Sequence, residues 1–173
     1  MKNNRSSTLL LCGMAGMSAV LFPLFSYAQT EPPERTITLP ILMYHYVESL
    51  EGATKRSAAL ITSPVIFEKQ LLALQERSYK TIFVSEIPGR LVSPLRSSPA
   101  IALTFDDGYE DFYANVLPLL KKYRAKATLY VVTEFIGKRG YLTQEEMKEI
   151  AASGLVSIGA HTLHHLNLPR LSS

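Results

Sequence analysis

The feature that most constrains the fold is an apolar run, Ile101 to Phe105, followed directly by Asp106-Asp107-Gly108. Such a run is typical of a strand buried on both faces, and the glycine marks the point where the strand leaves the sheet. Two adjacent carboxylates at that point are costly to bury unless a metal ion, a hydrogen-bond network or water compensates them. Taken alone, the pair is also explained by a turn that caps a helix.

Strand-like and helix-like segments alternate along the chain, which predicts an α/β fold with a parallel sheet. Strands are predicted over five segments, residues 37–44, 80–84, 101–105, 126–132 and 155–158. Helices are predicted over residues 64–78, 110–123 and from 143 to a stop at Gly154, with a polar loop over 48–59. An alternation of this kind is compatible with an open sheet or with a barrel.

Several end signals set the helix boundaries. Ser63 followed by Pro64 is a favourable helix start, and Thr143 to Glu146 is a capping-box sequence. Pro118 lies inside the predicted helix over 110–123, so that helix should either kink or begin late. A short helical turn is predicted at Ser85-Glu86, directly after the second strand.

The N-terminal segment has the pattern of a secretory signal peptide. A basic start precedes an apolar run over residues 8–25, and small residues at Ser26 and Ala28 predict a signal over residues 1–28, cleaved after Ala28. An uncleaved membrane anchor is the alternative, and it would be the only membrane contact that the sequence suggests. We therefore expect a linker over residues 29–36, a domain over 37–173, and export to the periplasm, the cell surface or the medium.

The charge and the cysteine content exclude some classes of function. The chain has 18 basic and 15 acidic residues, but Lys2 and Arg5 would leave with the signal, so 16 basic residues would face 15 acidic ones. No charge argument for a nucleic-acid partner remains. The one cysteine, Cys12, also lies in the predicted signal, so a packed core, or a core with bound metal, must stabilise the domain.

All four histidines of the chain follow predicted strands, as the two aspartates do; they are His45, His161, His164 and His165. Because the carboxyl ends of parallel strands meet at one edge of a sheet, we expect these side chains to gather there. A carboxylate with two imidazoles suits zinc and leaves room for water or substrate, and it also suits Fe(II), Co(II), Ni(II) or Mn(II).

Each histidine also has a plainer explanation. A single histidine after a strand, such as His45, is often a structural hydrogen-bond partner, and His164 could simply be exposed. His161 and His165 are four residues apart, so their rings would share one face if the chain turns helically after Ala160. The metal interpretation rests on the convergence of these residues rather than on any one of them.

Two segments resemble the first two motifs of the polysaccharide deacetylases with a NodB homology domain, carbohydrate esterase family 4. They are Thr104 to Gly108 and His161 to His165, and the likeness extends from about Ile41 to the C-terminus. The resemblance implies that Asp106 is the general base and that Asp107, His161 and His165 bind a divalent metal. That metal would be zinc foremost, with cobalt, nickel or iron as alternatives. It also implies a distorted (β/α) barrel of about seven strands, of which this sequence contains about five.

The reaction implied by the resemblance is hydrolysis of N-acetyl groups from an amino-sugar polysaccharide. The polymer could be poly-N-acetylglucosamine, peptidoglycan or a chitin-like chain. In this scheme Asp106 takes a proton from a metal-bound water, and the metal stabilises the oxyanion that follows. The leaving amine needs a proton as well. Ile41 to His45 resembles the opening of a permuted subgroup similar to the poly-N-acetylglucosamine deacetylases, and that likeness makes His45 the general acid.

The family's later motifs do not follow His165, and the sequence ends soon after it. We therefore expect a domain that is incomplete at its C-terminus and folds poorly or belongs to a longer product. The alternative function is a truncated, inactive form that only binds metal or polysaccharide. An Fe(II) oxygenase could use the same ligand set, but that fold is an antiparallel double sheet, which the alternation of strands and helices disfavours.

Overall fold

The computed structural model describes residues 38–51, 58–92 and 98–167. The predicted signal peptide and linker, residues 1–36, lie outside these ranges, so both stay predictions. No helix within the described ranges is long and apolar enough to cross a membrane.

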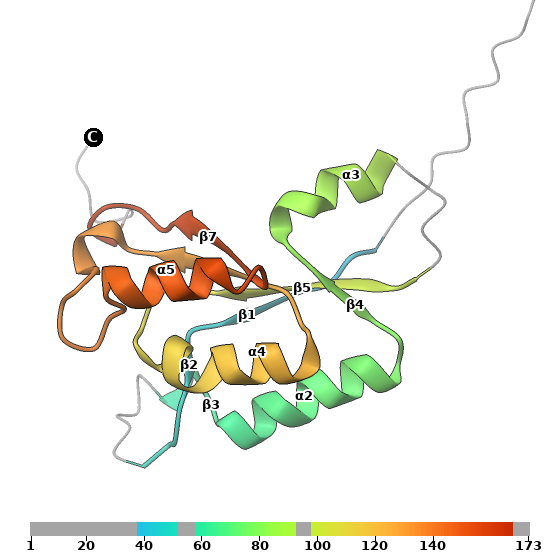
Figure 1. Cartoon of the computed structure of the whole chain (residues 1–173), viewed down its shortest axis with the longest axis horizontal. Helices are drawn as coiled ribbons and strands as arrows, with labels where there is room; N and C mark the ends of the chain where they lie inside the picture. Colours follow the sequence, from blue (N-terminus) through green and yellow to red (C-terminus); the bar gives the residue numbers. More distant parts are fainter. Residues whose placement is uncertain (1–37, 52–57, 93–97, 168–173) are drawn as a thin grey trace, which may run out of the picture. The chain divides into compact units, whose positions relative to one another are not determined.

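A five-stranded parallel sheet with β5 at its centre organises the described residues (Figure 1). Its strands are β1 (Ile41–Tyr44), β4 (Lys80–Ile82), β5 (Ala100–Phe105), β6 (Ala127–Val131) and β7 (Val156–Ala160). β1 pairs with one edge of β5 from Ala102 to Phe105. The other edge is shared, because β4 pairs with its first half and β6 with its second half. β4 and β6 therefore diverge, as strands do in a distorted barrel, and β7 continues the sheet beyond β6.

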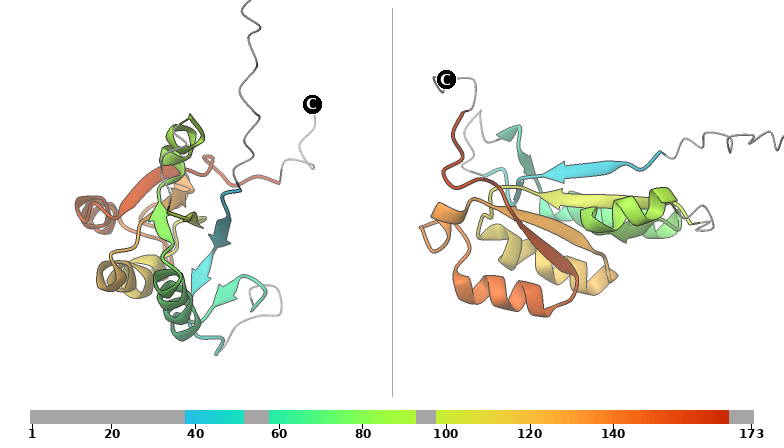
Figure 2. Two further views of the ribbon diagram at one scale, coloured as in Figure 1. Left: turned by 90° about the vertical axis from the view of Figure 1, so that its right-hand side faces the viewer. Right: turned by 90° about the horizontal axis from the view of Figure 1, so that it is seen from above.

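All five predicted strands are present, so the predicted parallel α/β architecture is confirmed. Every neighbouring pair in the sheet is parallel, and the carboxyl ends of β1, β5, β6 and β7 therefore lie at one edge (Figure 2). A separate parallel pair, β2 (Tyr46–Val47) with β3 (Ile61–Thr62), flanks the predicted loop. The sequence did not reveal this pair, because two-residue strands are too short to show any periodicity.

Three longer helices lie on one side of the sheet (Figure 1). They are α2 (Pro64–Glu76), α4 (Leu117–Tyr123) and α5 (Gln144–Ala152). The predicted helix caps are present. At the start of α2, the Ser63 hydroxyl accepts a hydrogen bond from the Ile66 N–H at 3.3 Å. Thr143 and Glu146 form the full capping box, and Gly154, with φ of +67°, follows the C-cap of α5.

The remaining helical turns are shorter, and one of them explains Pro118. The predicted helix over 110–123 begins as a π-helical turn, η2 (Phe112–Val116), and becomes α-helical only at Leu117. Pro118 therefore lies in the first turn of α4, where a missing N–H costs nothing. The predicted turn after β4 is present as η1 (Val84–Glu86) and α3 (Ile87–Val92), and η3 (Thr133–Phe135) follows β6.

Aromatic rings fill the core between β1, β5 and the helices. The Phe105 ring stacks on Tyr44 with centroids 5.0 Å apart and meets Phe67 and Phe112 edge-on at 5.5 and 5.0 Å. Phe67 and Phe105 are essentially unexposed. This packing anchors the last residue of β5, so the carboxylates that follow begin from a fixed point.

Candidate active site

A left-handed turn directly after β5 positions the two carboxylates. Asp107 and Gly108 both have positive φ, +74° and +78°, and aspartate is one of the few residues with a side chain that tolerates this region. Gly108 also passes close to β6: a Cβ there would lie 2.9 Å from Val131 Cγ1. The Asp106 N–H donates to the Tyr44 carbonyl at 3.0 Å, which fixes the start of the turn against β1.

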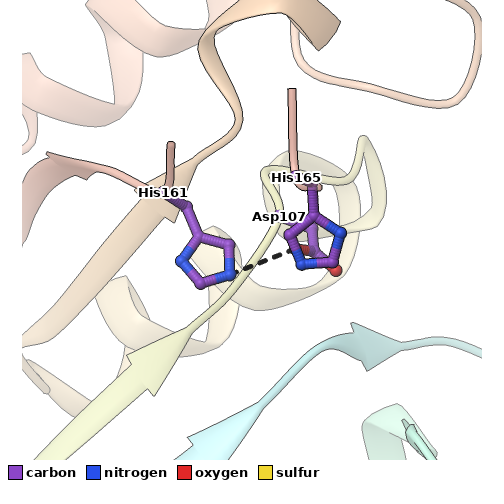
Figure 3. A group of neighbouring side chains, drawn as sticks. All are labelled: Asp107, His161 and His165. Carbon is purple, nitrogen blue, oxygen red and sulfur yellow. Dashed lines mark ion pairs between the residues drawn. The ribbon is translucent and has the colours of Figure 1, made fainter. Parts of the chain in front are cut away.

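Asp107, His161 and His165 converge at the carboxyl edge of the sheet (Figure 3). The Nε2 atoms of His161 and His165 lie 3.6 and 3.4 Å from Asp107 Oδ1, and one ligand atom from each residue lies within 4.8 Å of the others. The Asp107 side chain is only 6% exposed. Its Oδ1 has no hydrogen-bond partner among the described residues. A buried oxygen without a donor, facing two imidazoles, is the arrangement that a metal ion would complete.

The two histidines meet without a helix, so the helical turn considered for residues 161–165 is wrong. Thr162 and His165 have positive φ, +66° and +52°, and the Thr162 hydroxyl accepts from the His165 N–H at 2.9 Å. The segment is anchored on β6 and on the residues after it. The His161 N–H donates to Val131 O at 2.7 Å, and the Glu134 N–H donates to Leu163 O at 3.1 Å.

His164 points to a different partner from its two neighbours. Its Nδ1 contacts the Glu134 carboxylate, which also lies 3.6 Å from the Lys138 ammonium. The His164 side chain is about half exposed, as the plainer explanation expected. It takes no part in the Asp107 cluster, and its contact with Glu134 instead ties the histidine segment to the residues after β6.

Asp106 and His45 lie beside the cluster but outside it. Burial raises the pKa of the Asp106 carboxyl above its usual range, whereas the nearby His161 and His45 lower it. Asp107 raises the pKa of Asp106 further, by like-charge repulsion. A carboxylate with a raised pKa is a stronger base, provided that it stays ionised at the working pH. His45 is partly buried at the end of β1, close enough to Asp106 to influence its titration.

A stack of tyrosines beside the site was missed from the sequence. The ring of Tyr109 lies between those of Tyr46 and Tyr141, with centroids 3.9 and 5.0 Å away. The stack lines a pocket of about 650 Å³ together with Glu48, Asp111, Asn115 and Arg139. The sequence did contain an indication of this stack. Tyr46 and Tyr109 directly follow His45 and Gly108, which lie just after predicted strands.

Comparison with known proteins identifies the domain. The family described as polysaccharide deacetylase matches residues 95–173, which contain the Asp107, His161 and His165 cluster. This C-terminal part of the chain matches a polysaccharide deacetylase domain. It is 36% identical over 148 residues to YxkH of Bacillus subtilis, a protein provisionally named as a polysaccharide deacetylase. It is 29% identical over 138 residues to the poly-beta-1,6-N-acetyl-D-glucosamine N-deacetylase of Escherichia coli K12.

A solved structure shows the same fold. The Streptococcus pyogenes deacetylase PplD, determined in complex with acetate, superimposes with a TM-score of 0.67 at 34% identity. The match covers 79% of this chain and 61% of PplD. The alignments cover 85% of this chain but 49% of YxkH, and 70% of this chain but 20% of the Escherichia coli enzyme. The chain thus spans about half the length of YxkH. The predicted family and the predicted partial barrel of the NodB type are confirmed.

Proposed function

We propose that this chain is a metal-dependent hydrolase that removes N-acetyl groups from an amino-sugar polysaccharide. The observation that carries the proposal is the convergence of Asp107, His161 and His165, with the carboxylate of Asp106 beside them. The similarity to the Escherichia coli enzyme makes poly-N-acetylglucosamine the first substrate to test, with peptidoglycan and chitin-like polymers as alternatives. Export, inferred from the predicted signal over residues 1–28, would bring the chain to such a polymer.

Asp107, His161 and His165 would hold the metal, for which the nitrogen and oxygen donors favour zinc over calcium or magnesium. When bound, such an ion polarises a carbonyl group and makes water more acidic. Asp106 would accept the proton of the attacking water, and its raised pKa makes it a better base for that step. His45 would donate a proton to the nitrogen of the departing amino sugar. Neither of these two residues is needed to hold the metal.

The tyrosine-lined pocket supports the proposed substrate class. Its volume, about 650 Å³, exceeds that of a single sugar ring, and its lining includes Tyr46 and Tyr109, which adjoin His45 and Gly108 in the sequence. Sugar rings present apolar faces that pack well on aromatic side chains, and their hydroxyl groups need polar partners such as Glu48 and Arg139. We therefore place the units that adjoin the reacting sugar in this pocket.

Acetate release from β-1,6-linked N-acetylglucosamine oligomers tests the proposal. The wild-type chain should release acetate with added Zn²⁺ and stop when a chelator is present, and Asp106→Asn should lose at least about 100-fold in rate. Glu145→Gln is the matched control, because Glu145 lies on the exposed start of α5 and should leave the rate unchanged. Chitin and peptidoglycan oligomers, assayed in parallel, would identify the polymer.

Absence of metal-dependent acetate release from all three substrates would refute the enzymatic proposal. Zinc binding by the wild-type chain, measured by calorimetry, would then leave the alternative function, an inactive form that binds metal or polysaccharide. A full rate for Asp106→Asn would refute the assignment of the base alone. A full rate for His45→Ala on the same oligomers would refute the assignment of the acid.

A further inference from the structure

His45 is held on both sides by the segment that carries the site carboxylates. On one side, the Tyr44 carbonyl accepts a hydrogen bond from the Asp106 N–H at 3.0 Å. On the other side, the Val47 N–H donates to Asp111 Oδ2 at 2.5 Å, and Asn115 Nδ2 donates to the Val47 carbonyl at 2.8 Å. Both polar groups of one peptide residue, two positions after His45, are therefore bound by side chains from residues 111–115.

The contact with Asp111 is buried and the contact with Asn115 is partly buried. Val47 is wholly buried and the Asp111 side chain is nearly so. Asp111 forms no ion pair within the described ranges, and its partner is an uncharged peptide group. Burial raises the pKa of its carboxyl to about 6, and the nearby Glu48 and Glu110 carboxylates act in the same direction. An acidic side chain held at such a cost has a local role, and the contact with Val47 is the one that the geometry offers.

The π-helical turn η2 explains how two side chains reach one residue. Asp111 caps this turn and Asn115 lies within it, so the two side chains, four positions apart, project toward β2. π-Helical turns are rare and occur frequently at functional sites. On its other edge β2 pairs with β3, and the Tyr46 N–H donates to Leu60 O at 3.2 Å. The strand after His45 is thus fixed from two directions.

We propose that Asp111 and Asn115 are positioning residues that set the place of the His45 imidazole relative to Asp106. The proposal rests on the proposed function, in which His45 donates a proton to the leaving amine. The segment 106–115 would then carry the base, one metal ligand and the support of the acid. A positioning residue should affect the step that needs His45 and spare the steps that do not.

The leaving group provides a test that a purely structural role would not pass. An amide needs a proton on its departing nitrogen, whereas 4-nitrophenolate departs from 4-nitrophenyl acetate without one. Asn115→Asp keeps the shape of the side chain but places a carboxylate against the Val47 carbonyl in place of a donor. Measured at saturating oligomer, so that weaker binding in the tyrosine-lined pocket does not contribute, kcat for oligomer deacetylation should fall relative to ester hydrolysis by about tenfold or more. His45→Ala should change the same ratio in the same direction.

Two further variants separate positioning from stability. Asp111→Asn retains an oxygen that can accept from the Val47 N–H, so it should keep a ratio close to that of the wild type, whereas Asp111→Ala should not. Thr81→Val is the matched control, because the Thr81 hydroxyl accepts from the Lys126 N–H at 2.7 Å at the opposite end of the sheet. That variant loses a similar hydrogen bond and should leave the ratio unchanged.

A direct readout keeps the test independent of turnover. The NMR resonances of the His45 ring in the metal-free chain should shift in Asn115→Asp and Asp111→Ala and stay in place in Thr81→Val. If the wild-type chain released no acetate, the proposed function would fail while these shifts still supported the positioning role. An unchanged His45 resonance, or a rate ratio that stays constant in Asn115→Asp and Asp111→Ala, would overturn the inference.

Discussion

Replacing Gly108 by alanine should destabilise the domain through two separable effects. The first is the backbone, because φ at Gly108 is +78° and a side chain in that region costs about 1 kcal/mol. The second is a contact, because the new Cβ would lie 2.9 Å from Val131 Cγ1 and 3.2 Å from Val131 Cβ. Val131 lies in β6 and is buried, so it has little room to move, and overpacking of this kind costs about 1–3 kcal/mol. The expected total is about 2–4 kcal/mol.

Urea unfolding can resolve the two effects with two further variants. Gly154→Ala carries the backbone effect alone, because Gly154 has φ of +67° and nothing lies within 4 Å of its added Cβ. It should cost about 1 kcal/mol. Val131→Ala removes Cγ1, so in the double variant it should recover about 1–2 kcal/mol of the loss caused by Gly108→Ala. The cycle therefore isolates the contact between the turn and β6.

A definite order of stabilities is expected among these variants. Gly108→Ala must lose more free energy of unfolding than Gly154→Ala, and Val131→Ala must be coupled to the first change and not to the second. Equal costs at the two glycines, or additive effects of Gly108→Ala and Val131→Ala, would show that the turn is not packed against β6. Weakened zinc binding by Gly108→Ala would add a second signature, since Asp107 is the adjacent residue.

Two other predictions concern pH and metal. Below pH 4 the Asp111 carboxyl is protonated in both states, and between about pH 4 and 6 it stays protonated only in the folded state, where its pKa is about 6. The stability of the wild type relative to Asp111→Asn should therefore fall as the pH rises through this window, by up to ~3 kcal/mol in urea unfolding; a difference independent of pH would contradict the assigned cause. Zinc at 100 times its Kd should raise the free energy of unfolding by about 2.7 kcal/mol, His161→Ala should remove most of that gain, and magnesium should not replace zinc. A stabilisation that persists in His161→Ala would place the metal elsewhere.

The sequence predicted the elements that leave a local signature. The apolar run before Asp106 identified β5, and the capping box at Thr143 identified the start of α5. Pro118 correctly indicated that the helix would either kink or begin late, and the α-helical part begins only at Leu117, because a proline constrains the backbone wherever it occurs. The family resemblance and the shared position at strand ends predicted that Asp107, His161 and His165 would gather, and their side chains do lie together.

Features that depend on distant partners could not be predicted. The backbone of Thr162 and His165 is left-handed, and the N–H groups of Thr133 and Glu134 anchor the carbonyls of Thr162 and Leu163. A spacing of four residues suggested a helix only because those long-range bonds are invisible in the sequence. The contact between Asn115 and Val47 joins residues 68 positions apart and has no period that a sequence pattern could show.

The continuity of residues 106–115 bears on how the proposed chemistry would keep its geometry. Catalytic groups must be held within about 0.5 Å of their productive positions, and each independent element adds its own motion. Here the proposed base, one metal ligand and the two residues that bind Val47 belong to one short segment, anchored on β1 through the Tyr44 carbonyl. A displacement of this segment would move the base and the support of His45 together. We therefore expect the distance between the proposed base and the proposed acid to be less sensitive to motions of the sheet than the distance from either group to His161 and His165, which both follow β7.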